Sequence, residues 1–141
     1  MAGVIATAEV ELDATPDRVW AALTDPAEIK QYMFGSDVRT DWQPGSPITW
    51  SGEFQGKSYQ DKGEVIAVDE PHRLEVTHYS AMSGAADVPE NYHHLVYTLE
   101  PSAGGTRLRL EQDNNGSDEE AEHAAKNWQS MLDGLKKLVD G

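Results

Sequence analysis

At the start of the chain, hydrophobic and polar residues alternate in the way that a half-buried β-strand requires. This pattern runs from Val4 to Asp13 and is rich in β-branched side chains, which favour strands. After it, the apolar residues Val19, Trp20 and Leu23 fall at helical spacing. The chain therefore predicts a strand followed by a helix.

Two proline-containing steps divide this helical region into two short helices. Thr15 is a suitable N-cap, and Pro16 follows it at the first helical position. Asp25-Pro26 ends the first helix and begins the second, because a residue that precedes a proline rarely adopts the helical conformation. The apolar residues of the second helix are again three or four positions apart: Ile29, Tyr32 and Met33.

Residues 36–115 predict six further strands that are joined by short turns rich in glycine and proline. Short connections favour antiparallel pairing, because a parallel return needs a crossover of roughly a dozen residues or more. The expected strands cover residues 36–42, 48–54, 57–69, 73–80, 91–100 and 106–115.

The last part of the chain predicts a long amphipathic helix. Ser117 is a suitable N-cap, acidic residues occupy the first turn and lysines the last, as the helix dipole favours. Gly134 lies within this helix and costs about 1 kcal/mol relative to alanine unless close packing compensates. The helix has one apolar stripe, formed by Ala121, Ala124, Ala125, Trp128, Met131, Leu132, Leu135, Leu138 and Val139. Residues 1–141 thus predict a single α+β domain with the order β-α-α-β6-α.

Charge and composition exclude several classes of partner. The net charge of −14 repels phosphate backbones and anionic lipids, so we expect neither nucleic acid nor a membrane surface as a partner. No apolar run approaches the roughly 18 residues of a membrane span, and the first residues lack the basic start of a signal peptide. The chain has no cysteine, which favours a cytoplasmic location.

The strand alternation predicts which side chains face the last helix, because every second residue of a strand points to the same side of the sheet. The expected inward set has polar tips at His78, Tyr97, Gln112 and Asn114, whereas Tyr79 is expected on the outer face. The residues that we expect around a space between sheet and helix are Trp50, His78, Tyr97, Leu108, Gln112, Trp128, Met131 and Leu135. Such a lining is typical of a small-molecule pocket. It is equally typical of a filled core, and the pattern leaves both readings open.

The candidate chemical groups are few. His93 and His94 point to opposite faces of a strand and cannot chelate one ion without a bulge, so we expect no metal site and no cofactor. His123 reads as a solvated residue. His78 is the best acid–base candidate, but no nucleophile or carboxylate is paired with it by a recognisable spacing. Asp61, on a neighbouring strand, reads as part of a surface ion pair. We therefore predict no catalytic residue, and whether the chain is an enzyme stays open.

Three stretches and the tryptophan-bearing last helix, in this order, resemble the START-like (SRPBCC) superfamily. The stretches are "TPDRVWAALTDPAEIKQYM", "TWSGEFQGKSYQDKGEVIAVDEPHRLEVTH" and "YTLEPSAGGTRLRLEQ". Within that superfamily, the chain is most similar to the heat-shock protein 90 ATPase-activator homologue family, from about Val10 to Val139. The resemblance implies the helix-grip fold, in which a curved antiparallel sheet wraps a long C-terminal helix and the two short helices partly close a hydrophobic cavity. Members often carry a tryptophan late in the second helix, where this chain has Tyr32, Met33 and Phe34.

Three functions follow as hypotheses. The first is the binding of a small hydrophobic molecule, lipid-like or aromatic, in that cavity. The second, implied by the family, is regulation of a chaperone ATPase or a role in the stress response. The eukaryotic activators carry an additional N-terminal domain, for which 141 residues leave no room. The third is a small cyclase or hydrolase in which His78 or Tyr97 moves a proton. We expect a monomer, because no long apolar surface stripe is left over.

Overall fold

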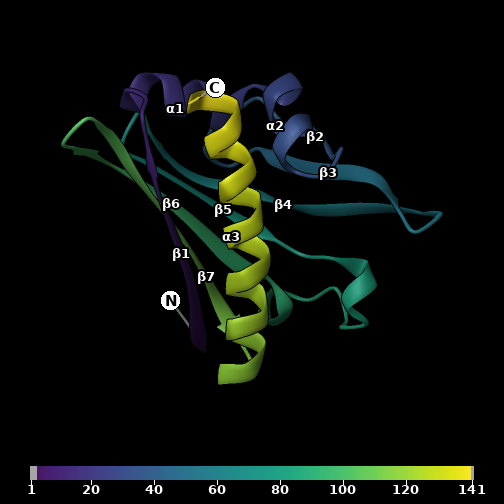
Figure 1. Cartoon of the computed structure of the whole chain (residues 1–141). Helices are drawn as coiled ribbons and strands as arrows, with labels where there is room; N and C mark the ends of the chain where they lie inside the picture. Colours follow the sequence, from purple (N-terminus) through teal and green to yellow (C-terminus); the bar gives the residue numbers. More distant parts are fainter. Residues whose placement is uncertain (1–2, 141) are drawn as a thin grey trace.

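The computed structural model describes residues 3–140, with the exception of the side chains of Phe54 and Met82. One strand, two short helices, six strands and a long helix follow one another (Figure 1). Their bounds are β1 (Val4–Leu12), α1 (Pro16–Thr24), α2 (Pro26–Tyr32), β2 (Asp37–Arg39), β3 (Pro47–Phe54), β4 (Lys57–Asp69), β5 (Arg73–His78), β6 (His93–Ser102), β7 (Gly105–Asn115) and α3 (Asp118–Asp140). Two 3₁₀ turns, η1 (Ala81–Ser83) and η2 (Pro89–Asn91), lie between β5 and β6.

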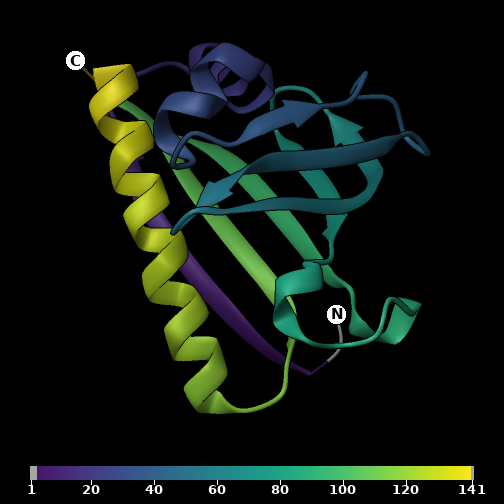
Figure 2. The same ribbon diagram turned by 90° about the vertical axis from the view of Figure 1, so that its right-hand side faces the viewer.

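The seven strands form one antiparallel sheet in the order β1-β7-β6-β5-β4-β3-β2. The sheet curves around α3, and α1 and α2 cover the end at which α3 finishes (Figures 1 and 2). The predicted α+β helix-grip architecture is therefore confirmed. Among the helices that the structure describes, none combines the length and the apolarity that a bilayer span requires.

The predicted helix caps are present. The Thr15 hydroxyl accepts a hydrogen bond from the Arg18 N–H at 3.2 Å, and the Asp25 carboxylate accepts one from the Ala27 N–H at 3.0 Å. At α3, Ser117 Oγ accepts from the Glu120 N–H at 3.1 Å. Each cap satisfies an N–H that the helix itself leaves without a partner, so these residues set where the helices begin.

The core lies between the concave face of the sheet and the C-terminal half of α3. Its fully buried side chains come from the strand faces and the helix stripe that the period of the sequence predicts: Leu12, Ile48, Leu95, Leu108, Leu110, Met131, Leu132 and Leu135. The side chains of α1 and α2 complete this core from one end. Burial of this apolar surface contributes about 25 cal/mol per Å2 and is the main force that holds α3 in the curve of the sheet.

The end of the second strand differs from the prediction, and one residue expected on the outer face is buried. The second strand ends at Arg39 rather than Trp42, because Trp42 has a left-handed backbone (φ 59°) and Asp41 Oδ1 accepts from the Gln43 N–H to form a turn. Tyr79 is on the outer face as predicted, yet it is buried. Its ring stacks on Tyr92 with the centroids 5.2 Å apart, so the segment between β5 and β6 covers this part of the sheet.

An ion pair fastens that covering segment. Lys62 on β4 contacts Asp87, and the Tyr92 hydroxyl donates to Asp87 Oδ1 at 2.6 Å. The hydrogen bonds from Lys62 and Tyr92 lower the pKa of Asp87, so its carboxylate stays ionised to lower pH than an ordinary aspartate. The segment 80–92 is therefore held against the middle of β4, at Lys62.

Candidate functional site

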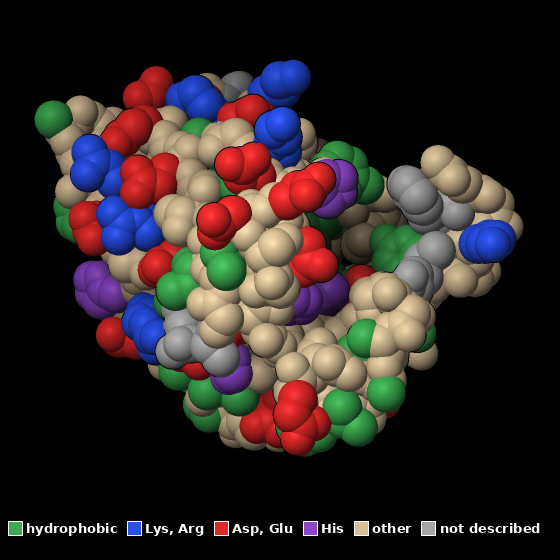
Figure 3. Space-filling model, turned by 90° about the horizontal axis from the view of Figure 1, so that it is seen from below, with side chains coloured by type: hydrophobic (Ala, Val, Ile, Leu, Met, Phe, Trp, Pro, Cys, Tyr) green, Lys and Arg blue, Asp and Glu red, His purple; other side chains and the backbone are tan. Residues whose placement is uncertain are grey.

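A cleft of about 1360 Å3 separates the N-terminal half of α3 from strands β3 to β7. Seen from below, the molecule is hollowed here, with acidic and histidine side chains at the rim (Figure 3). The cleft exists because α3 changes character along its length. Residues 119–127 include charged and polar side chains that favour water, whereas Met131, Leu132 and Leu135 are fully buried against the sheet.

The inner wall of the cleft is apolar and aromatic. Trp50 from β3 and Leu95 from β6 contribute the sheet side, and Trp128 and Met131 contribute the helix side. Met33, at the end of α2, closes one end. Methionine side chains adapt readily to the shape of a ligand, and aromatic rings offer large flat contact surfaces.

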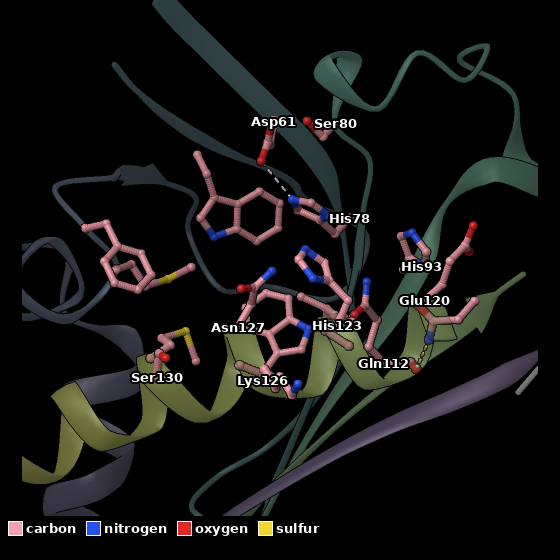
Figure 4. A pocket seen from close by; sticks show the side chains of 18 of the residues that line it. Asp61, His78, Ser80, His93, Gln112, Glu120, His123, Lys126, Asn127 and Ser130 are labelled. Carbon is pink, nitrogen blue, oxygen red and sulfur yellow. Dashed lines mark hydrogen bonds and ion pairs between the residues drawn. The ribbon is translucent and has the colours of Figure 1, made fainter. Parts of the chain in front are cut away.

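A histidine–aspartate pair lies in the sheet wall. His78 Nε2 and Asp61 Oδ2 are 2.9 Å apart, and each side chain is 18% exposed (Figure 4). The two residues lie diagonally across β4 and β5, next to the bridge between Lys62 and Tyr79. The Trp50 ring meets the His78 ring edge to face, with the centroids 5.0 Å apart. The arrangement fixes the orientation of the imidazole from two sides.

Two further hydrogen bonds orient the polar groups of the wall. Trp128 Nε1 donates to Gln112 Oε1 at 2.7 Å, which ties α3 to β7 across the end of the cleft. His93 Nδ1 is 2.7 Å from the Asp113 carbonyl oxygen, so Nδ1 carries the proton and donates. His94 points away from the cleft and pairs with the Asp113 carboxylate. Among the residues that the structure describes, no group of three or more His, Asp or Glu is placed to hold a metal ion.

The structure brings some of the predicted site residues to the cleft and leaves others in the core. Trp50, His78, Gln112, Trp128 and Met131 line the cleft. Leu108 and Leu135 are fully buried in the core. Tyr97 lies beside a separate space of only about 20 Å3, which is the size of one water molecule. Burial raises the pKa of the Tyr97 hydroxyl, so it stays neutral at physiological pH.

Asn114, expected as an inward polar tip, is turned the other way. Its backbone is left-handed (φ 60°), which interrupts the alternation of β7. Its amide donates to the carbonyl oxygens of Glu90 and Tyr92 at 2.7 and 3.0 Å, and Asn115 lines the cleft instead. The prediction for Asn114 was wrong because a period of two holds only along regular strand backbone.

Sequence reasoning missed several cleft residues. Asp61 was read as a surface group, and His123 as simply solvated, although His123 is exposed on the side of α3 that faces the cleft. For Asp61 the signal was incomplete: an uninterrupted count back across the predicted hairpin at residues 70–72 places Glu64, not Asp61, opposite His78. The β-bulge between Val65 and Ala67 shifts that count by one residue, which only the structure reveals.

Phe34 is an exposed aromatic residue at the rim of the cleft. It is 76% exposed and has a left-handed backbone with φ of 56°. The Gly35 N–H donates to the Lys30 carbonyl at 3.0 Å, which makes Phe34 the C′ residue of a Schellman motif that ends α2. Glycine is the usual residue there, because a side chain costs about 1–2 kcal/mol in this conformation. Strained residues of this kind cluster at functional sites.

Replacing Phe34 with glycine is expected to stabilise the protein by about 1 kcal/mol, because the left-handed strain is relieved and little packing is lost. Chemical denaturation of the variant and the parent measures the difference. Phe34→Ala is the matched control, since it removes the ring but keeps the strain, and its stability should stay near that of the parent. A loss of stability in Phe34→Gly would show that the ring packs on the fold.

A family model described as "Activator of Hsp90 ATPase homolog 1-like protein" matches residues 13–140. The chain belongs to this family. The resemblance seen in the sequence is thereby confirmed. No curated protein matches the sequence.

Solved structures share the fold of this chain. A structural-genomics target protein from Cytophaga hutchinsonii is 42% identical, with a TM-score of 0.85 over 99% of this chain and 95% of that one. A protein from Mesorhizobium loti is 23% identical, with a TM-score of 0.78 over 97% of both chains. The Aha1 dimer from Colwellia psychrerythraea is 20% identical, with a TM-score of 0.74 over 97% and 96%. The last two likenesses show the fold alone.

Proposed function

We propose that this member of the activator-homologue family binds a small hydrophobic molecule, aromatic rather than purely aliphatic, in the cleft between the sheet and α3. The observation that carries the proposal is the cleft itself, with a volume of about 1360 Å3 and an inner wall of two tryptophans, two methionines and a leucine. Ligand pockets are typically about 300–1,000 Å3, so the space is sufficient for a molecule of several rings.

The polar groups of the cleft support binding of a molecule that is mostly apolar but not featureless. His78 and Gln112 hold fixed positions through their bonds to Asp61 and Trp128. A few fixed polar groups in an apolar wall orient a ligand, because each unmatched polar atom of a wrong ligand loses its hydrogen bonds to water. The stacking surface of Trp50 and Trp128 favours flat rings.

The four tryptophans allow a test with internal controls. Trp50 and Trp128 line the cleft, whereas Trp20 is buried in the core and Trp42 packs against the core. We expect a titration with neutral aromatic compounds, sterols and fatty acids, followed by amide and indole NMR, to give saturable shifts for the first two indoles. The other two indole signals should stay in place. Equal shifts of all four, or none across the whole panel, would contradict the proposal.

A variant that fills the cleft provides the complementary test. Ala124 lines the cleft from α3, so Ala124→Trp is expected to weaken binding at least tenfold while the fold is retained. Lys137→Trp is the matched control, because Lys137 is exposed on the same helix outside the cleft. If both variants bind the same compounds as tightly as the parent does, the ligand site lies elsewhere.

A further inference from the structure

We infer that the cleft recognises an aromatic molecule that carries a hydrogen-bond donor, such as a phenol hydroxyl, and that Nδ1 of His78 accepts this hydrogen bond. The inference rests on the proposed function and names the chemistry of its ligand. It is carried by a polar atom that the fold leaves without a partner in the wall of the cleft.

Nδ1 of His78 is that atom. Among the residues that the structure describes, it is the one buried side-chain nitrogen or oxygen that has no hydrogen-bond partner. An unmet hydrogen bond of this kind costs about 1–3 kcal/mol, so its persistence calls for an explanation. A ligand that enters the cleft supplies one, because His78 is part of the lining.

The bond to Asp61 decides what Nδ1 can do. A carboxylate only accepts, so the Nε2 atom of His78 must donate to Asp61 Oδ2 across their 2.9 Å contact. In the neutral imidazole, Nδ1 is then the acceptor. A charged imidazolium would instead bury an N–H without a partner, and orphaned buried N–H groups are rarer than orphaned acceptors. The matching ligand group is therefore a donor.

The surroundings of His78 indicate that the donor is attached to an aromatic ring. The Trp50 ring packs against the imidazole at a centroid distance of 5.0 Å, so a group that reaches Nδ1 lies beside an indole. Nδ1 itself is buried, so a ligand group reaches it only when neighbouring side chains move. His123 and Asn127 on the α3 side are exposed, and rotamer changes of exposed side chains take only picoseconds to nanoseconds. These side chains can yield to an entering ring.

The charge of the lining disfavours an anionic ligand. Lys126 is the one Lys or Arg among the described residues of the lining. The carboxylates of the lining belong to Glu53, Asp61, Glu119, Glu120 and Glu122. A fatty-acid carboxylate would be repelled by these negative charges. At His78 it would place a hydrogen-bond acceptor against Nδ1, which is itself an acceptor. A neutral phenol meets neither obstacle, so the structure favours it over a lipid acid.

Three probes that share one ring system test the inference: 2-naphthol, its methyl ether 2-methoxynaphthalene, and 2-naphthoate. We expect 2-naphthol to bind about five- to tenfold more tightly than the ether, as one net hydrogen bond predicts, and 2-naphthoate to bind more weakly than the ether. In wild-type protein labelled with ¹⁵N-histidine, 2-naphthol should move the His78 Nδ1 resonance and the ether should not.

Variants assign the effect to the residue. In Asp61→Asn/His78→Phe an aromatic ring is kept while the acceptor and the partly buried carboxylate are both removed, so 2-naphthol should lose its advantage over the ether. His72→Phe is the matched control, because His72 is exposed in the turn between β4 and β5 and does not line the cleft. The advantage should persist there.

The outcomes separate the inference from the proposed function. If 2-naphthol and its ether bind equally and both shift the Trp50 and Trp128 indoles, the cleft binds aromatics but the role of His78 is overturned. Tighter binding of 2-naphthoate would overturn it as well. If none of the three probes binds, and neither does the wider panel of compounds, the proposed function itself fails and the inference with it.

Discussion

Gly63→Ala is expected to lower the free energy of unfolding by about 3 kcal/mol, because the strand beside Gly63 leaves no room for a side chain. A Cβ at this position would lie 1.7 Å from the Thr77 carbonyl oxygen and 2.5 Å from its carbon. Both atoms belong to the backbone of β5, so the clash cannot be relieved by a rotamer change. The strands β4 and β5 would have to separate where they hold Asp61 and His78.

Urea denaturation of the purified variant measures this loss. Gly134→Ala is the matched control, because a Cβ there would meet Tyr32 Cβ at an ordinary contact distance of 3.5 Å. Close packing therefore does not require glycine in α3, and the helix propensity of alanine should raise stability by about 1 kcal/mol. Opposite signs for the two substitutions are the expected result. If Gly63→Ala were as stable as the parent, this result would contradict the close contact between Gly63 and the Thr77 carbonyl group of β5.

Leu135→Ala is expected to cost about 2–5 kcal/mol and to leave ligand affinity unchanged. Leu135 is fully buried in the core under the sheet, at the end of α3 that lies away from the cleft. Removing its side chain leaves a cavity that the surrounding strands cannot fill by collapse. Thermal or urea unfolding gives the loss, and a titration with 2-naphthol gives the affinity.

Leu138→Ala provides the comparison on the same helix. Leu138 is only partly buried against the core, so the same chemical change should cost roughly 1 kcal/mol. A Leu135→Ala variant that loses ligand binding at temperatures where it is fully folded would contradict its place in the core. It would then belong to the ligand site, as the apolar stripe of the last helix had suggested.

The order and type of the elements were predictable from local patterns. Thr15-Pro16 and Ser117 mark helix starts through backbone hydrogen bonds that involve only neighbouring residues. The alternation in residues 106–112 places Leu108 and Leu110 inside because strand geometry forces every second side chain to one face. Local predictions failed where the backbone left the regular conformations: a strand end was misplaced at Trp42, and an inward side chain was wrongly assigned at Asn114.

The candidate site was predictable only in part. Inward-facing residues were found by their period, but the period does not say whether an inward residue meets the helix or an open space. Tyr97 and His78 both read as polar tips, yet one lies beside a space of about 20 Å3 and the other beside the large cleft. That difference depends on the distance between α3 and the sheet at each position along the helix.

By itself, the sequence determined an acidic chain with consecutive antiparallel strands and one long amphipathic helix, because period, caps and turns are local properties. Tertiary structure alone decided that the polar half of α3 leaves a cleft and that its apolar half closes the core. It also brought Asp61 to His78 through a bulge in β4. The physical reason is that a contact between strands depends on register and curvature, which arise from the packing of the whole sheet rather than from neighbours along the chain.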